Sequence, residues 1–382
     1  MTLKILIAPN AFKNSLDAVT AATSIAKGLQ RSQLDCHCLL QPIADGGDGM
    51  LTVMLSQEGA TEHKAVVDGP LGRRVEAAYG LLEGGKTAVI EMAEASGIRL
   101  LSPEELNPMK TSTYGTGQLI RAALDAGAQE IVIGIGGSAT VDLGLGMTQA
   151  LGIQLINSQG KPVIRGGAGV EQLSAIDMSS LDQRIRDTRI FVTCDVTNTL
   201  SKAPSVFGPQ KGASKAMVQR LENAFEKAGK LIEKSLGKKV MHVRHGGAAG
   251  GLGAALFAFL GAELLDGTDY LLSRTGFHQA LLEAELVITA EGALDMQTQS
   301  GKGPFYVARA AREQQKPVVM LAGSLPKDYD PDTYQVYDVV LPIGPRPEPL
   351  EEALKNTSAN LERTALQVGN MLALSTKKMG RT

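Results

Sequence analysis

The residues best suited to chemistry form a loop rich in glycine and hydroxyl groups. It follows a short β-branched run, residues 131–133, and contains Gly136, Gly137, Ser138 and Thr140. Glycines let backbone N–H groups come close to a ligand, and the hydroxyls and the helix expected next would suit an anion. The spacing matches neither the G-x-G-x-x-G nor the G-x-x-x-x-G-K-[ST] motif. The loop is therefore either a cradle for a phosphate or carboxylate, or a tight strand-to-helix turn that binds nothing.

Four more polar loops follow segments that read as strands. They contain Asn10 and Lys13, Asp45 and Asp48, Asp195 and Asn198, and Glu291, Asp295, Ser300 and Lys302. Phosphoryl transfer needs cations on the phosphates, carboxylates for Mg²⁺ and a base for the incoming hydroxyl group, so this combination favours that reaction. For each carboxylate taken alone, an ordinary role in a turn or a helix cap is the alternative.

Two clusters of histidine and cysteine need separate interpretation. The segment His242–His245 precedes an apolar helix, where it either binds an anion or forms an exposed loop. Cys36, His37 and Cys38 lie in a predicted strand, whose side chains alternate between the two faces, and no second ligand pair exists to complete a metal site. We therefore expect no metal there. The odd number of cysteines, three, fits a reducing compartment.

The composition limits the possible partners. The chain has 382 residues, of which 43% are hydrophobic, and a net charge of −2, so it is long enough for two or three domains with sizeable cores. Balanced charge does not indicate a nucleic-acid or membrane partner, and the 4% aromatic content disfavours a base-stacking surface. We find no signal-peptide pattern and no run of about 18 apolar residues, which predicts a cytoplasmic protein.

The two ends of the chain share one pattern, in which strands alternate with helices. The predicted strands are residues 3–8, 36–41, 286–289, 318–321 and 339–343. The predicted helices begin after Ser15, as the N-cap, and after Gly49, and cover 304–315 and 348–375. We predict one doubly wound parallel sheet from residues 1–64 and 285–382, with ligands at the strand ends.

Residues 65–284 follow a different pattern. Predicted strands over 64–67, 75–82 and 87–92 have hairpin spacing and suggest an antiparallel meander. Strands over 131–133 and 190–193 and helices over 118–126 and 216–236 follow, and an almost wholly apolar helix begins within residues 246–253. We predict an inserted mixed α/β domain.

Six ordered motifs, which span nearly the whole chain, resemble the type I glycerate kinase family. They occupy residues 42–49, 110–117, 133–140, 207–213, 248–254 and 297–302. The resemblance implies ATP-dependent phosphorylation of D-glycerate to 2-phosphoglycerate. It also implies a flavodoxin-like domain built from both chain ends, an inserted α/β domain, and an active site in the cleft between them.

This resemblance suggests roles for the polar loops. ATP would be held by Gly136, Gly137, Ser138, Thr140, Thr116, Gly117, Ser300 and Gly301. Lys13 and Lys302 would neutralise anionic groups, and Glu291 and Asp295 would hold Mg²⁺, alongside Asp45 or Asp48. Asp195 is the candidate base, with Asp45 and Asp48 as alternatives. The expected partners are ATP and D-glycerate, for a monomer or a homodimer.

The chain departs from the family's usual residues at several positions, five of which bear on substrate choice. These are Asn10, Val141, Leu143, Thr199 and Ala293, where the family usually has Asp, Asn, Gly, Pro and Arg. The losses leave two alternatives open, a kinase of a related small hydroxy acid and a small-acid binding or sensing protein with weak catalysis. A dehydrogenase is disfavoured, because no βαβ pattern contains G-x-G-x-x-G with an acidic residue about twenty positions later.

Overall fold

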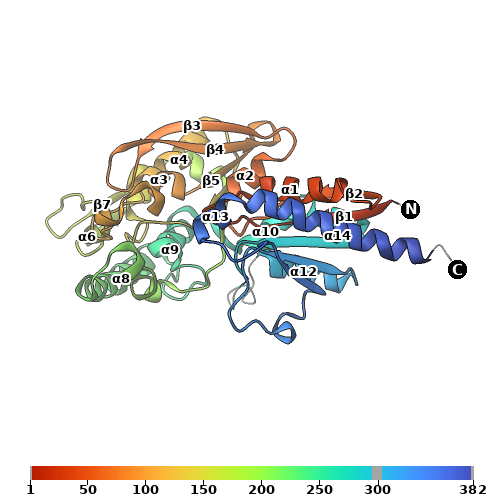
Figure 1. The fold of residues 1–382 in the computed structure, drawn as a ribbon. Helices are drawn as coiled ribbons and strands as arrows, with labels where there is room; N and C mark the ends of the chain where they lie inside the picture. The colour runs from red at the N-terminus through yellow and green to blue at the C-terminus, as the bar shows by residue number, and fades with distance from the viewer. Residues whose placement is uncertain (1, 295–302, 380–382) are drawn as a thin grey trace. The chain divides into compact units, whose positions relative to one another are not determined.

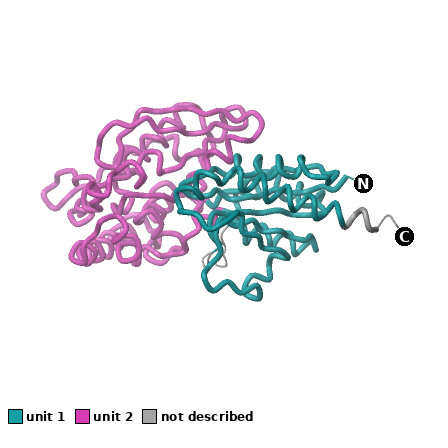
Figure 2. The backbone as a smooth tube through the Cα atoms, in the orientation of Figure 1, with its two compact units in different colours: residues 1–45, 268–382 teal, residues 46–267 magenta. Residues whose placement is uncertain are grey.

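The chain divides into two compact units, each built from its own sheet and core. The computed structural model describes residues 2–294 and 303–379. Unit 1 comprises residues 1–45 and 268–382, and unit 2 comprises residues 46–267 (Figure 2). Residues 46–64 fall in unit 2 rather than with the chain ends, since the helix α2 (Met50–Leu55) contacts strands of that unit. Residues 268–284 fall in unit 1, because Leu272 and Phe277 belong to its core.

The sheet of unit 1 is entirely parallel. Its strands are β1 (Leu3–Ile7), β2 (Cys36–Leu40), β11 (Leu286–Glu291), β12 (Val318–Ala322) and β13 (Val339–Pro342). They lie in the order β13-β12-β11-β1-β2, which is the flavodoxin-like order with its reversal between β1 and β11. The predicted doubly wound sheet built from both chain ends is confirmed.

Helices cover both faces of this sheet (Figure 1). They are α1 (Ala18–Gln30), α10 (Gly267–Arg274), α11 (Phe277–Glu283), α12 (Gly303–Glu313), α13 (Leu350–Lys355) and α14 (Thr357–Met379). Side chains of β1 alternate between two cores: Ile5 and Ile7 pack with α1 and α14, and Leu6 packs with α11 and α12. Gly28 lets α1 and α14 approach closely, because a Cβ there would lie 2.2 Å from the carbonyl oxygen of Glu362.

Two local predictions in unit 1 were wrong. The N-cap of α1 is Asp17, whose carboxylate accepts from the backbone N–H of Thr20, whereas the hydroxyl of Ser15 donates to the carbonyl of Leu354. The single helix predicted over 348–375 is two helices, α13 and α14, separated at Asn356.

Unit 2 contains a mixed sheet in the order β10-β9-β6-β5-β4-β3. The strands are β3 (Thr61–Asp68), β4 (Arg74–Leu82), β5 (Thr87–Glu91), β6 (Glu130–Gly134), β9 (Arg189–Cys194) and β10 (Glu263–Asp266). The pairs β3–β4 and β4–β5 are antiparallel, as the meander predicted. The pairs β5–β6, β6–β9 and β9–β10 are parallel, so polar loops again follow strands at a shared edge. A separate pair, β7 (Gln154–Ile156) and β8 (Ala175–Asp177), is antiparallel.

Helices of unit 2 pack around one large core that contains the apolar helix. The other helices, besides α2, are α3 (Ala93–Ser96), α4 (Tyr114–Asp125), α5 (Leu145–Ala150), α6 (Gly167–Val170), α7 (Ala203–Phe207) and α8 (Lys215–Leu236). The apolar helix α9 (Ala248–Leu260) is almost wholly buried, but its first turn is not right-handed. Ala249, Gly250 and Gly251 have φ values of 52°, 64° and 92°, so the regular helix begins only after them. Within the described ranges, no helix has both the length and the apolar character that crossing a membrane requires.

Candidate functional site

The switch point of unit 1 brings the loop that contains Lys13 next to the end of β11, where Glu291 lies. The loops after β1 and β11 are tied together, since the backbone N–H of Asn10 donates to the carbonyl of Ala290 at 2.8 Å. A Cβ on Gly292 would lie 3.6 Å from the backbone nitrogen of Lys13. Lys13 is exposed, whereas Glu291 is buried at the end of β11. This edge, where ligands bind in open α/β sheets, therefore combines a solvent-facing cation with a carboxylate.

The other predicted residues of unit 1 divide into two groups. Asp45 follows β2 at the same edge and is half-buried. Asp295, Ser300, Gly301 and Lys302 lie outside the described residues. The departures Asn10 and Ala293 lie in the loops of this edge, half-buried and exposed respectively, so both are placed where they can affect a ligand.

In unit 2, glycines allow three segments to pass so close that their backbones are in contact. These segments are the glycine loop, residues 46–48 and the end of β9. A Cβ on Gly136 would lie 2.4 Å from the Cα of Gly47, and a Cβ on Gly46 would lie 2.9 Å from the carbonyl carbon of Thr193. Gly137 is exposed, has a φ of 68°, and would place a Cβ 2.8 Å from Oδ1 of Asp48. The structure thus brings Asp48 to the glycine loop, as a site requires.

Asp195 belongs to this same edge. It is exposed and comes directly after β9, which pairs with β6, the strand that leads into the glycine loop. The loop after Asp195 is anchored, because the backbone N–H of Gly247 donates to the carbonyl of Asn198 at 2.8 Å. Asp48, the glycine loop and Asp195 therefore share one edge of the unit 2 sheet.

A buried lysine that we did not include among the predicted site residues supports the glycine loop. Lys211 ends a short 3-10 turn, η6 (Pro209–Lys211), and is 1% exposed. Its ammonium group donates to Oγ of Ser138 at 2.6 Å and to the carbonyl of Thr140 at 2.8 Å. A lysine in a polar loop normally indicates solvent exposure, so only its place in the 207–213 motif could have drawn attention to it.

Asp142 is a second buried charge beside this loop. Its carboxylate accepts from the N–H and hydroxyl of Thr113, at 2.8 and 2.9 Å, and from the N–H groups of Gly144 and Gly146, at 3.1 and 3.3 Å. Burial raises the pKa of Asp142. Burial lowers the pKa of Lys211 to about 7, against the opposing effect of the Asp142 charge. Both groups are thus titratable side chains buried beside the glycine loop.

Asp142 also corrects the prediction that a helix start after the glycine loop would bind an anion. The next helix, α5, begins at Leu145, and the N–H groups of its first turn at Gly144 and Gly146 already donate to this carboxylate. The anion at this helix start is the chain's own side chain. An external anion at this edge would therefore have to be bound by residues 136–138 and not by the start of α5.

Three predicted nucleotide-binding residues of unit 2 are internal. The hydroxyl of Thr116 pairs with Ser96 at 2.8 Å inside the core, and Gly117 lets α4 pack on α5, because a Cβ there would lie 2.4 Å from the carbonyl of Met147. Thr140 is fully buried, and its hydroxyl has no hydrogen-bond partner among the residues that the structure describes. The contacts of Thr116 and Gly117 are those of packing, so we leave these two out of the proposed site.

His245 is buried, so the exposed-loop interpretation of residues 242–245 is wrong for this residue. It has a φ of 66°, an unfavourable value for a residue with a side chain. Its Nδ1 donates to the carbonyl of Val196 at 2.8 Å. His245 therefore helps to hold the loop that contains Asp195, whereas His242 is exposed.

The described part of the chain gathers no group of three or more His, Cys, Asp or Glu side chains that could hold a metal ion. Mg²⁺ does not require such a group, since it is commonly bound by one or two carboxylates together with phosphate oxygens and water. Asp48 and Glu291 are carboxylates of the right type, each at the ligand-binding edge of its own unit. These residues are compatible with Mg²⁺ that arrives with a nucleotide.

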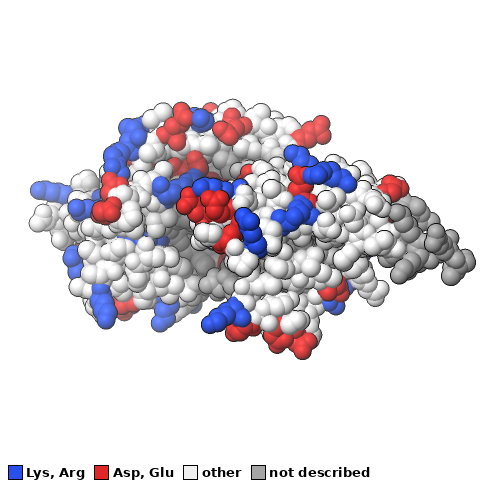
Figure 3. All heavy atoms as spheres, viewed as in Figure 1, with Lys and Arg blue, Asp and Glu red and all other residues white. Residues whose placement is uncertain are grey.

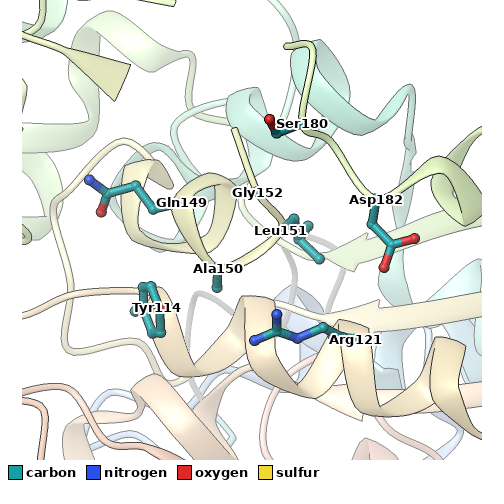
Figure 4. A pocket seen from close by; sticks show the side chains of 8 residues that line it. All are labelled: Tyr114, Arg121, Gln149, Ala150, Leu151, Gly152, Ser180 and Asp182. Atoms are coloured by element: carbon teal, nitrogen blue, oxygen red, sulfur yellow. The ribbon is translucent and has the colours of Figure 1, made fainter. Parts of the chain in front are cut away.

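A pocket of about 310 Å³ lies elsewhere in unit 2, between α4, α5 and residues 180–182 (Figure 4). It is lined by Tyr114, Arg121, Gln149, Ala150, Leu151, Gly152, Ser180 and Asp182. None of the candidate site residues lines it, so it is not the chemical centre described above. On the face drawn in Figure 3, positive and negative side chains are interspersed, without a large surface of one sign.

Comparison with known proteins identifies the family. The model of the glycerate kinase family matches residues 5–373. The chain belongs to the glycerate kinase family. It is 44% identical to a glycerate kinase of Halalkalibacterium halodurans, over 95% of this chain and 97% of that protein. It is 42% identical to glycerate 2-kinase of Escherichia coli K12, over 99% of this chain and all of that protein.

A solved structure extends this relationship to the fold. The crystal structure of a Salmonella typhimurium LT2 protein assigned as glycerate kinase 2 superposes with a TM-score of 0.88 at 43% identity, covering 99% of this chain and 100% of that chain. The family resemblance and the kinase class predicted from the motifs are confirmed. Among the departures from the family pattern, Val141 and Leu143 are fully buried, so they alter the interior of unit 2 rather than its surface.

Proposed function

We propose that this kinase transfers the γ-phosphoryl group of MgATP to the C2 hydroxyl group of D-glycerate, with 2-phosphoglycerate and ADP as products. The observation that supports this most is the exposed backbone at Gly137 beside the hydroxyl of Ser138, at the strand edge of a glycerate kinase family member. Exposed backbone N–H groups in a glycine turn suit phosphate oxygens. The name of the E. coli relative, glycerate 2-kinase, supports the choice of C2.

In this proposal the two units supply different groups. Unit 2 supplies the loop Gly136–Ser138 for phosphate and Asp195 as the base that takes the proton of the attacking hydroxyl. Unit 1 supplies Lys13, a cation for the carboxylate of glycerate or the transferring phosphoryl group. Lys302 would act with Lys13, and Asp45 and Asp48 are the alternative bases.

Magnesium enters as part of MgATP, where it would neutralise phosphate charge. Asp48 and Glu291 are the described carboxylates that would hold it, together with Asp295. Asp48 lies beside Gly137 in unit 2 and Glu291 ends β11 in unit 1, and the described residues form no closed cage of three ligands. The chain's own part is to position the two anions, because phosphoryl transfer depends chiefly on orientation and on stabilising charge.

The regiochemistry follows from how a small acid can be held. The C2 hydroxyl lies next to the carboxylate of glycerate, whereas the C3 hydroxyl is one rotatable bond further away. A site that binds the carboxylate tightly therefore fixes C2 better than C3, and a well-fixed hydroxyl loses less entropy on reaching the transition state.

One observation favours a second candidate, a kinase of a related small hydroxy acid. Asn10 and Ala293 stand where the family usually has Asp and Arg, and both are at least partly exposed at the edge of unit 1. ADP release with MgATP and a panel of hydroxy acids distinguishes the candidates. We expect D-glycerate to give the highest kcat/KM. A higher value for another acid would assign that acid as the substrate, and ADP release with none would leave only binding.

The base assignment has its own test in the same assay. Asp195→Asn keeps the size of the side chain and removes the basic site, so we expect kcat to fall by about 10²- to 10⁴-fold with an unchanged affinity for ATP. Full retention of kcat in a folded variant would move the role to Asp45 or Asp48.

A further inference from the structure

The proposed function leaves one buried cation without a role. Lys211 is enclosed in unit 2, 1% exposed, and it contacts the glycine loop from the interior. We propose that Lys211 is a positioning residue: its ammonium group directs the hydroxyl hydrogen of Ser138 outward, as a hydrogen-bond donor for a phosphate group lying on the loop 136–138. This inference rests on the proposed function, since it assigns the phosphate of MgATP to that loop.

The donor and acceptor inventory sets the direction of this hydrogen bond. An ammonium group has three donors and no acceptor, so Ser138 Oγ must accept from Lys211 at 2.6 Å. A hydroxyl group has one hydrogen, and that of Ser138 has no acceptor among the residues that the structure describes. Ser138 is 9% exposed and lies next to the exposed Gly137. Its hydrogen can therefore serve a ligand.

Lys211 itself is poorly placed to be the phosphate ligand. Its two acceptors, Ser138 Oγ and the carbonyl of Thr140, belong to the loop it supports. The turn that carries it is tightly packed, because Gly212 has a φ of 86° and a Cβ there would lie 2.3 Å from the carbonyl of Leu106. A direct contact with solvent-borne phosphate would require this packed turn to move.

The remaining bonds of the loop show why a charged anchor is needed. The carbonyl of Gly137 accepts from the N–H of Ile98 at 2.8 Å, and Ala139 is held on both sides, by the carbonyl of Ser96 at 2.9 Å and the hydroxyl of Thr111 at 2.8 Å. These neutral bonds fix the backbone. Among the described residues, only Lys211 forms a hydrogen bond with the side chain of Ser138, so this bond sets the direction of that hydroxyl.

Loss of the Lys211 proton would allow the bond to reverse. A neutral amine has a lone pair, to which Ser138 could donate, and the hydroxyl would then be unavailable to a ligand. The pKa of Lys211 is lowered to about 7 by burial, and the carboxylate of Asp142 is the charged group that opposes this shift. As pH rises through this value, we expect the KM of MgATP to increase, because a falling fraction of the enzyme holds the ammonium form.

The experiment measures steady-state kinetics of the full chain for Lys211→Met, Ser138→Ala and the double variant. Each single variant should raise the KM of MgATP by about 10- to 100-fold, the range for a hydrogen bond that involves a charged group. If Lys211 acts through Ser138, the double variant should be little worse than either single variant. Lys215→Met, the same change at an exposed lysine four residues later, is the matched control and should leave KM unchanged.

Two further measurements keep the test decisive if Lys211→Met folds poorly. Ser138→Thr retains a hydroxyl and should restore most of the affinity lost in Ser138→Ala. The rise in the KM of MgATP between pH 6 and 9 should be present in the wild type and absent in Ser138→Ala.

Several outcomes would overturn the inference. They are additive effects in the double variant, an unchanged KM of MgATP in either single variant, equal pH profiles of the wild type and Ser138→Ala, and an increase confined to the KM of D-glycerate. Absence of any ADP release from the wild type is a different result, because it would contradict the proposed function and not the role of Lys211.

Discussion

The two units each contribute a lysine near a strand edge, and the two lysines differ in almost every physical respect. Lys13 of unit 1 is exposed on the loop after β1, at the switch point of a parallel sheet. Lys211 of unit 2 is enclosed, donates to two groups of its own chain, and has a pKa lowered to about 7. The first lysine can meet a ligand directly, whereas the second can act only by shaping the loop that meets it.

The two units also differ in where left-handed backbone occurs: beside Lys13 it is found at the exposed Asn14, with a φ of 61°, whereas in unit 2 it is buried. Leu143, His245 and Ala249 have φ values of 54°, 66° and 52°, all buried in unit 2. Left-handed backbone is unfavourable for residues with a side chain and persists where the surroundings enforce it. Unit 2 therefore holds its loops by buried charge and enforced conformation, and unit 1 presents its side chains on an ordinary doubly wound sheet. Variants at Lys13 and at Asp142 should therefore separate an effect on catalysis from an effect on stability.

The largest expected effect is on turnover, in unit 1. Lys13→Met removes an exposed cation without touching a core, so we expect kcat to fall by several orders of magnitude, because charge stabilisation dominates phosphoryl transfer. The melting temperature should stay within the scatter of repeated measurements. Near-normal turnover would show that Lys13 is a solvated loop residue without a role in catalysis. The proposed difference in function between the two lysines would then be contradicted.

The next effect is on stability, in unit 2. Asp142→Ala leaves four buried donor groups without an acceptor and Lys211 without its opposing charge. Leaving a buried donor unsatisfied costs about 1–3 kcal/mol, so urea unfolding should show a loss of at least about 3 kcal/mol for the four donors together. Asp142→Asn keeps one acceptor oxygen and should lose less. A change below about 0.5 kcal/mol, which is ordinary for surface positions, would contradict the role of Asp142 as the acceptor of these four donors.

A smaller effect tests the enforced backbone. Leu143 is fully buried with a φ of 54°, at a position where the family usually has Gly. Both Leu143→Ala and Leu143→Gly lose packing worth about 2–5 kcal/mol. Glycine ordinarily destabilises relative to alanine, but here it escapes the left-handed cost of about 1–2 kcal/mol. We therefore expect Leu143→Gly to be the more stable of the two in denaturant unfolding, and the opposite order would contradict the left-handed assignment.

Local patterns in the sequence predicted most of the fold. The apolar runs at β1, β11 and β12 and the change of spacing after residue 61 were sufficient for the parallel sheet of unit 1 and the antiparallel start of unit 2. Helix ends were less certain. Ser15 and Asp17 are both good N-caps, and the difference was decided by a turn between Phe12 and Leu16 and by a bond from Ser15 to Leu354.

The candidate site was predictable where its residues are exposed and local. Lys13, Asp48, Asp195 and the glycine loop could be selected because polar loops follow strands. The positions of Lys211 and Asp142 could not be predicted, because their burial depends on contacts with distant residues, and Ser138 lies 73 positions from Lys211. The opposite error occurred at Thr116. Its polar motif suggested a residue that binds ATP, but its hydroxyl pairs with Ser96 inside the core.

The central claim is that the chain phosphorylates D-glycerate at C2, and phosphorus NMR of the product tests it most directly. The protein is incubated with MgATP and D-glycerate, and the phosphate ester signal is compared with authentic 2- and 3-phosphoglycerate. We predict a single new ester signal that coincides with 2-phosphoglycerate and requires both substrates. A signal that coincides with 3-phosphoglycerate, or no ester at all from D-glycerate, would contradict the claim.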